Sequence, residues 1–243
     1  MTAILVLMDS RQSKLLAAII DQFIQTAVPV GSKELLTHCD FCLSGATIRN
    51  EMRVLGDEGF LEQPHISAGR VPTAKGYRVY VKEYLNPGAQ EKIVHKKFAS
   101  LKEQYFHRKD QERAYEAVAL LSQMIPNIAF ATVPHKPGVY FLGLAHALRQ
   151  IEFRQDPMLA SAVVEVLEER ITDVLKKIEI DNKVRYYIGE EHILPQFQSC
   201  SMMITGYSVR GNTGVIGVLG HMRMDYAYNT VALELVADLL RAA

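Results

Sequence analysis

Residues 44–59 read SGATIRNEMRVLGDEG, a run with the marks of a helix that has a defined start and stop. Ser44 is a favourable N-cap, because its hydroxyl can accept a hydrogen bond from a free backbone N–H of the first turn. Gly59 supplies the stop, since glycine adopts the left-handed conformation without a Cβ clash. We therefore expect a helix over 44–58. Its apolar face carries Ile48, Met52 and Leu55, and its polar residues fall largely on the other faces: Thr47, Arg49, Asn50 and Arg53.

Two further helices are predicted before this one. Apolar residues recur at steps of one, three and four over residues 12–26, which is the stripe of an amphipathic helix. Pro29 and Gly31 then break the pattern, and Ser32 can cap a short second helix over residues 32–36.

The residues after the central helix predict a strand and a loop. Residues 60–62 can form a short strand, and a loop over 63–74 follows, interrupted by prolines and a glycine. Residues 77–84 close the segment with alternating and aromatic residues. Three helices followed by a strand and a looped excursion is the order of a winged helix-turn-helix.

Positive charge gathers in this loop although the chain as a whole has 27 basic and 27 acidic residues. Between His65 and Lys82 there is no acidic residue, and the basic ones are Arg70, Lys75, Arg78 and Lys82. Arginine suits guanine edges and asparagine suits adenine edges, so the helix over 44–58 presents side chains for base contacts. The basic loop suits phosphates. A solvated helix beside an ordinary basic loop has the same composition, and both interpretations stay open on these residues alone.

The order of several segments closely resembles the N-terminal domain of the heat-inducible transcription repressor HrcA family. The matching segments are PVGSK (29–33), SGATIRNEM (44–52), QPHISAGRVPT (63–73) and GYRVYV (76–81). A weaker resemblance to the family's GAF-like domain covers residues 188–191, 201–207, 214–220 and 223–226. Together these matches span nearly the whole chain.

The resemblance implies a homodimeric repressor that binds a double-stranded DNA operator, the inverted repeat called CIRCE, at chaperone operons. It also implies that the GroEL chaperonin supports this activity. The helix over 44–58 is then the recognition helix, and the following loop is the wing. The implied DNA-binding residues of the helix are Ser44, Thr47, Arg49, Asn50 and Arg53. Those of the wing region are His65, Ser67, Arg70, Lys75 and Arg78.

The chain departs from the family pattern at several points. Gly45 stands where serine or proline is more usual, and Gly56 stands where glutamate is expected. The usual proline-threonine before Arg223 is missing. The chain is also shorter in the middle, where the family carries its inserted dimerisation domain, so the mode of dimerisation stays open. The usual start of family members resembles the stretch just before Arg11, so Met8 is an alternative site for translation initiation.

The second half predicts an α+β domain. The best boundary is at residues 86–88, and residues 91–124 predict a polar, helical connector. Strands are expected over 128–133, 139–144, 184–188, 201–209 and 214–219, with helices over 158–178 and 226–241. We expect a winged-helix DNA-binding domain over 1–86, the connector over 87–126, and a GAF-like dimerisation or sensor domain over 127–243.

Other patterns carry less chemistry. Cys39 and Cys42 form a C-x-x-C pair without a second pair, so a packing role is favoured over a metal site. Glycines recur every third residue from Gly211 to Gly220, and turn geometry and close packing explain them better than a phosphate loop. No metal, cofactor or enzymatic activity is predicted. With no signal peptide and no membrane span in the sequence, we expect a cytoplasmic protein.

Two other functions remain open. GAF-like folds commonly hold ligands, so the chain is alternatively a winged-helix regulator whose second domain binds a small-molecule effector. The other rival is an enzyme or interaction module with a vestigial winged helix, because fold alone does not prove function.

Overall fold

The computed structural model describes residues 10–38, 44–105, 113–133, 138–191, 198–209 and 212–242. Three features discussed above lie outside these ranges: the alternative start at Met8, the cysteine pair at 39–42, and Gly211. The chain divides into two compact units, Met1–Leu85 and Asn86–Ala243.

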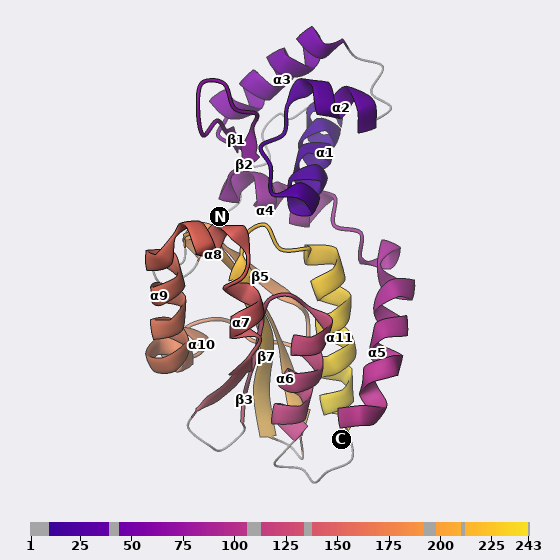
Figure 1. The fold of residues 1–243 in the computed structure, drawn as a ribbon. Helices are drawn as coiled ribbons and strands as arrows, with labels where there is room; N and C mark the ends of the chain where they lie inside the picture. Colours follow the sequence, from indigo (N-terminus) through magenta and orange to yellow (C-terminus); the bar gives the residue numbers. More distant parts are fainter. Residues whose placement is uncertain are drawn as a thin grey trace. The chain divides into compact units, whose positions relative to one another are not determined.

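In the described residues of the first unit, four helices pack together beside a two-stranded sheet (Figure 1). Its elements are α1 (Ser10–Thr26), α2 (Ser32–His38), α3 (Gly45–Asp57), β1 (Leu61–Glu62), β2 (Val71–Pro72) and α4 (Ala74–Glu83). The two strands pair antiparallel. The apolar stripes of the helices meet in the core, where the largest fully buried side chains are Leu15, Leu16, Ile19, Ile20, Leu35, Ile48, Leu55 and Tyr77. The predicted helices over 12–26, 32–36 and 44–58 are confirmed, with ends shifted by a residue or two.

Residues 77–84 differ from what their alternation suggests, because most of them lie in helix α4. Thr73 is the N-cap, and its Oγ1 accepts a hydrogen bond from the backbone N–H of Gly76 at 3.2 Å. Tyr77, Tyr80 and Val81 then fall on one helical face and are buried. The Tyr80 hydroxyl also donates to Asp21 of α1 at 2.6 Å. The cap and the helical spacing together outweigh the short alternation.

The second unit is built on a five-stranded antiparallel sheet in the order β4-β3-β7-β6-β5. The strands are β3 (Ile128–Thr132), β4 (Val139–Leu142), β5 (Arg185–Ile188), β6 (Cys200–Val209) and β7 (Asn212–His221). All five predicted strands are confirmed, although residues 143–144 lie outside β4. Two short helices, α7 (Leu144–Ala147) and α8 (Ile151–Gln155), were not predicted.

Helices cover both faces of this sheet (Figure 1). On one side are α6 (Arg113–Met124) and α11 (Tyr226–Arg241), with α5 (Glu91–Tyr105) packed on them after the turn η1 (Pro87–Ala89). On the other side are α9 (Pro157–Glu165), the π-helical turn η2 (Val166–Arg170) and α10 (Ile171–Leu175), followed by β5 and the short turn η3 (Gly189–Glu191). The predicted helix over 158–178 is thus interrupted by a π turn, whereas the one over 226–241 is confirmed.

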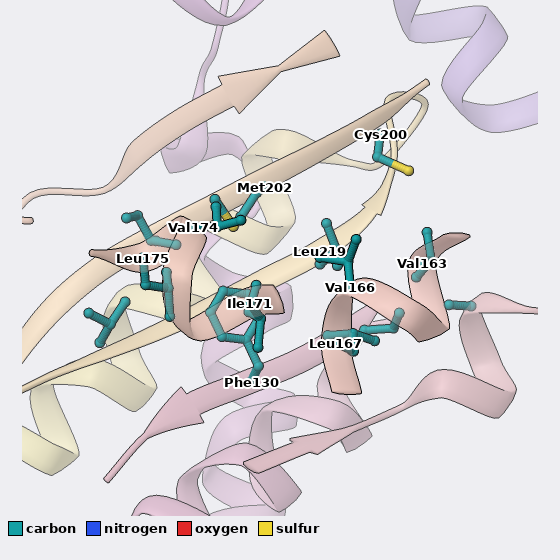
Figure 2. Close-up of a cluster of buried hydrophobic side chains, with 14 of the residues drawn as sticks. Phe130, Val163, Val166, Leu167, Ile171, Val174, Leu175, Cys200, Met202 and Leu219 are labelled. Atoms are coloured by element: carbon teal, nitrogen blue, oxygen red, sulfur yellow. The ribbon is translucent and has the colours of Figure 1, made fainter. Parts of the chain in front are cut away.

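The side chains between the sheet and the helices α9, η2 and α10 form a hydrophobic cluster. Figure 2 shows Val166, Ile171 and Val174 gathered with Phe130 of β3, Met202 of β6 and Leu219 of β7. These strand residues alternate with neighbours that face α6 and α11, as the two-residue period of a strand requires.

Helix α6 belongs to the core of the second unit, although the sequence groups it with a polar connector. Nine of its twelve residues are buried, and it packs against β3 and α11. No helix within the described ranges has the length and apolar character that a membrane crossing demands.

The glycines of β7 serve close packing, as predicted. A Cβ on Gly217 would lie 2.6 Å from the carbonyl oxygen of Met203, and one on Gly220 would lie 2.3 Å from the amide of Asn127. A Cβ on Gly214 would meet the ring of Tyr207 at 2.5 Å. A side chain at any of these three positions would force the contacted atoms to move.

Candidate nucleic-acid interface

Helix α3 separates its residues by chemistry. Its apolar side is buried in the first unit, with Ile48 and Leu55 fully enclosed. Arg49, Asn50 and Arg53 are exposed on the opposite side. The structure therefore brings three of the predicted base-contacting residues onto one solvent-facing surface of a well-anchored helix.

The start of α3 is capped as predicted. Ser44 Oγ accepts a hydrogen bond from the backbone N–H of Thr47 at 3.1 Å, and the two hydroxyl oxygens lie 2.9 Å apart. The N–H groups that a helix leaves without an intrahelical partner in its first turn give this end a partial positive charge, which favours a nearby anion.

The arginines of α3 differ in their surroundings. Arg53 donates to Asp57 Oδ2 at 3.1 Å and to Asn50 Oδ1 at 3.3 Å, so these three exposed residues form one row along the helix. Arg49 makes no side-chain hydrogen bond or ion pair with any residue that the structure describes. Arg49 is thus available for a ligand without first breaking a contact.

A buried carboxylate that the sequence analysis missed anchors α3 to α1. Glu51 is buried on α3 and accepts hydrogen bonds from the side chains of Arg11 and Gln12, the latter at 2.9 Å. Its helical spacing from Ile48 and Leu55 places it on the buried face, which is the one indication that the sequence offered. This contact ties the buried face of α3 to the start of α1.

The loop between β1 and β2 (residues 63–70, the β1–β2 loop) is internally hydrogen bonded. The side-chain amide of Gln63 donates to the carbonyl oxygens of Ile66 and Ala68, each at 3.0 Å. The backbone N–H of Ala68 donates to the carbonyl of His65 at 2.9 Å. His65 and Ser67 are exposed on this loop, so both predicted side chains face solvent.

Arg70 and Gly69 fasten the base of the loop to the segment before α2. Arg70 and Val30 exchange two backbone hydrogen bonds of 2.9 Å as an isolated antiparallel bridge. Gly69 is required here, because a Cβ would lie 2.5 Å from the Val30 carbonyl carbon and oxygen. The Arg70 side chain extends to Gly56, near the end of α3, so it lies beside the helix rather than at the tip of the loop.

Lys75 and Arg78 occupy α4, away from the tip. Lys75 Nζ donates to the carbonyl of Glu58 at 2.7 Å and lies 4.2 Å from the centroid of the Phe60 ring. Those contacts give Lys75 a structural role in closing the C-terminal end of α3. Arg78 is half-buried. Among the described residues, no cluster of three or more His, Cys, Asp or Glu side chains is placed to hold a metal ion.

Comparison with known proteins identifies relatives along almost the whole chain. A family model described as "HrcA protein C terminal domain" matches residues 10–229. The heat-inducible transcription repressor HrcA of Lactobacillus acidophilus is 30% identical over 238 residues, covering 98% of this chain and 64% of that protein. The chain thus spans less than two thirds of that relative's length.

A second relative locates the difference in length inside the match. The heat-inducible transcription repressor HrcA of Carboxydothermus hydrogenoformans is 24% identical over 340 aligned positions, covering 96% of this chain and 97% of that protein. Since this chain has 243 residues, about a hundred aligned positions of that relative have no counterpart here.

The fold also matches a solved structure. A crystal structure of a hypothetical protein at 2.2 Å resolution superimposes with a TM-score of 0.77 and 17% identity, covering 97% of each chain. That likeness concerns the fold alone. The match of the family model across residues 10–229 shows that this chain belongs to the HrcA family.

Proposed function

We propose that this chain is a transcriptional repressor of heat-shock chaperone genes that binds an inverted-repeat DNA operator of the CIRCE type as a homodimer. In this proposal the first unit is a winged helix-turn-helix, with α3 as recognition helix and the β1–β2 loop as wing. The second unit is a GAF-like domain that dimerises or senses.

The observation that supports the proposal is the exposed polar face of α3. Arg49, Asn50 and Arg53 point to solvent from a helix whose other side is buried and tied to α1 through Glu51. A helix of this kind fits the major groove, where arginine can make two hydrogen bonds to guanine and asparagine two to adenine. Packing within the unit does not require side chains of this chemistry on that face.

The β1–β2 loop supplies the backbone contacts in this proposal. His65 and Ser67 can hydrogen bond phosphate or sugar oxygens, and Arg70 lies beside α3 where it can neutralise a phosphate. The hydroxyls of Ser44 and Thr47 sit at the N-terminus of α3, which favours a phosphate there. Lys75 acts as a positioning residue through its bond to the end of α3.

Dimerisation explains why an inverted repeat is needed. Two-fold symmetry places one recognition helix on each half-site, so the operator mirrors the protein. The GroEL chaperonin is the proposed partner that maintains the binding-competent state. Heat then lowers the competent population by loss of that support or by partial unfolding.

Fluorescence anisotropy with a CIRCE-type inverted repeat and a scrambled duplex of equal composition tests the proposal. We expect the repeat to bind tighter by about a thousandfold or more, and binding to weaken as salt is raised. Arg49→Ala should lose this preference. Arg154→Ala, an exposed arginine of α8 in the second unit, is the matched control and should keep it. Equal binding to both duplexes, with and without added chaperonin, would refute the proposal.

A further inference from the structure

The most exposed large apolar side chain among the described residues lies in the β1–β2 loop. Ile66 has a relative exposure of 101%, compared with 79% for Met158 and 60% for Ile93. Single exposed apolar residues are common on protein surfaces, so exposure alone assigns no role. Two features of its surroundings do point to a role: the hydrogen-bonded loop backbone and the polar neighbouring residues.

The backbone holds Ile66 in place although its side chain packs on nothing. Its carbonyl oxygen accepts a hydrogen bond from Gln63 at 3.0 Å, and the same amide binds the carbonyl of Ala68. The bridge between Val30 and Arg70 fixes the base of the loop. A side chain presented on such a preformed tip loses little conformational freedom when a partner encloses it.

The chemistry around Ile66 favours a polyanion as that partner. His65 and Ser67, its two neighbours, are exposed hydrogen-bonding residues, and residues 63–73 include no acidic side chain. A protein partner that docks on an apolar patch needs a contiguous apolar surface, and Ile66 stands among polar neighbours. Minor-groove proteins frequently insert an apolar side chain between base steps while polar side chains contact the groove.

We propose that Ile66 is an apolar wedge that enters the DNA minor groove beside each half-site and bends the duplex at a flexible pyrimidine–purine step. This inference rests on the proposed operator binding and adds to it a specificity for DNA deformability. Such steps unstack at low cost and A-tracts are stiff, so the sequence at the wedge would be selected without hydrogen bonds to its bases.

Three variants test the wedge. Ile66→Ser removes the apolar side chain and keeps the loop backbone, Ile66→Leu preserves the apolar bulk, and Ile93→Ser is an exposed control in the second unit. Anisotropy measures affinity for inverted repeats flanked by either TA steps or A-tracts. Energy transfer between dyes on the two DNA ends measures bending.

We expect Ile66→Ser to weaken binding to the TA-flanked repeat by about tenfold or more, as loss of one enclosed apolar side chain would. It should also reduce the bend and remove the preference for TA flanks. The salt dependence should stay unchanged, because isoleucine neutralises no phosphate. Ile66→Leu and Ile93→Ser should behave as the unmodified chain.

Two results would overturn the inference. If Ile66→Ser binds and bends the repeat as the unmodified chain does, while Arg49→Ala loses binding, the wedge is wrong and the proposed function stands. If the unmodified chain itself shows no preference for the repeat, the proposed function fails and the wedge fails with it.

Discussion

The Arg70 guanidinium lies against Gly56 in the last turn of α3. A Cβ added to Gly56 would be 3.4 Å from Arg70 Nη1 and 3.7 Å from the carbonyl oxygen of Leu61. Position 56 thus lies next to the Arg70 guanidinium, and a methyl group there would come into contact with it. This pairing connects the β1–β2 loop with the helix that we propose reads DNA.

Gly56→Ala should stabilise the first unit. Glycine inside a helix costs roughly 0.5–1 kcal/mol relative to alanine, and 3.4 Å from the end of a flexible side chain is tolerable after a small shift. We expect the free energy of unfolding, measured by hydrogen exchange of the α1 and α3 amides, to rise by about that amount. Gly59→Ala is the control, because Gly59 has a φ of 77° and alanine there should destabilise by about 1 kcal/mol. A loss of stability in Gly56→Ala would show that Arg70 cannot shift.

The contact between Arg11 and Glu51 should be cooperative. Glu51 is buried, whereas the Arg11 side chain is 49% exposed. Glu51→Ala removes a buried acceptor and leaves the part-buried donors of Arg11 and Gln12 without it, so we expect a loss of about 2–3 kcal/mol in unfolding free energy. Arg11→Ala should cost about 1 kcal/mol, since the guanidinium is half in solvent. A double-mutant cycle by urea denaturation should give a coupling energy of about 1 kcal/mol. Strictly additive effects would show that Arg11 does not hold α3.

Asp57 should weaken DNA binding in the unmodified chain. Its carboxylate is exposed and pairs with Arg53 at 3.1 Å, so it places negative charge on the proposed DNA-facing row. Asp57→Asn should raise operator affinity by about threefold to tenfold at low salt, with a smaller gain at high salt because the effect is electrostatic. Asp173→Asn breaks a similar exposed helix pair with Lys176 in the second unit and should leave affinity unchanged. Equal affinity of Asp57→Asn and the unmodified chain would place Asp57 away from the DNA.

Local sequence signals predicted much of the fold. Ser44 and Gly59 bracket α3 because a cap and a stop act within one helical turn, and the structure has both at those positions. The strands of the second unit could be predicted from runs of β-branched and aromatic residues, which are also a local signal. The alternation over 77–84 did not reveal helix α4, because the cap at Thr73 lies outside that window.

Contacts between distant residues were beyond such signals. The carboxylate of Glu51 is forty residues from Arg11, and the end of Arg70 meets Gly56 only because the Val30 bridge turns the loop back. The same limit applies to Lys75, because its charge could not reveal that its amine donates a hydrogen bond to the Glu58 carbonyl. Composition counts a charge, but tertiary structure decides which partner satisfies it.

A partly buried cluster of one acidic and two basic residues lies at the end of β7 in the second unit. Arg223 donates two hydrogen bonds to Glu152, and its backbone N–H donates to His221 Nδ1 at 3.2 Å. Burial lowers the pKa of His221 to about 4, and Arg223 adds to that effect while Glu152 opposes it. Burial alone would raise the pKa of Glu152, but the hydrogen bond from Arg223, a backbone hydrogen bond and the charges of His221 and Arg223 together outweigh burial and lower it.

The second unit should therefore lose stability in mild acid. Between the ordinary pKa of histidine, 6.5, and about 4, the unfolded chain binds a proton at His221 that the folded chain does not, so stability falls as pH falls. From pH 7 to pH 5 this linkage amounts to about 2 kcal/mol of unfolding free energy. His221→Asn keeps an acceptor for the Arg223 N–H and cannot titrate. The loss of unfolding free energy from pH 7 to pH 5, measured by urea denaturation at each pH, should therefore be smaller by that amount. His146→Asn, at an exposed histidine of α7, should lose as much unfolding free energy from pH 7 to pH 5 as the unmodified chain. If His221→Asn loses as much unfolding free energy from pH 7 to pH 5 as the unmodified chain, another group causes the acid sensitivity.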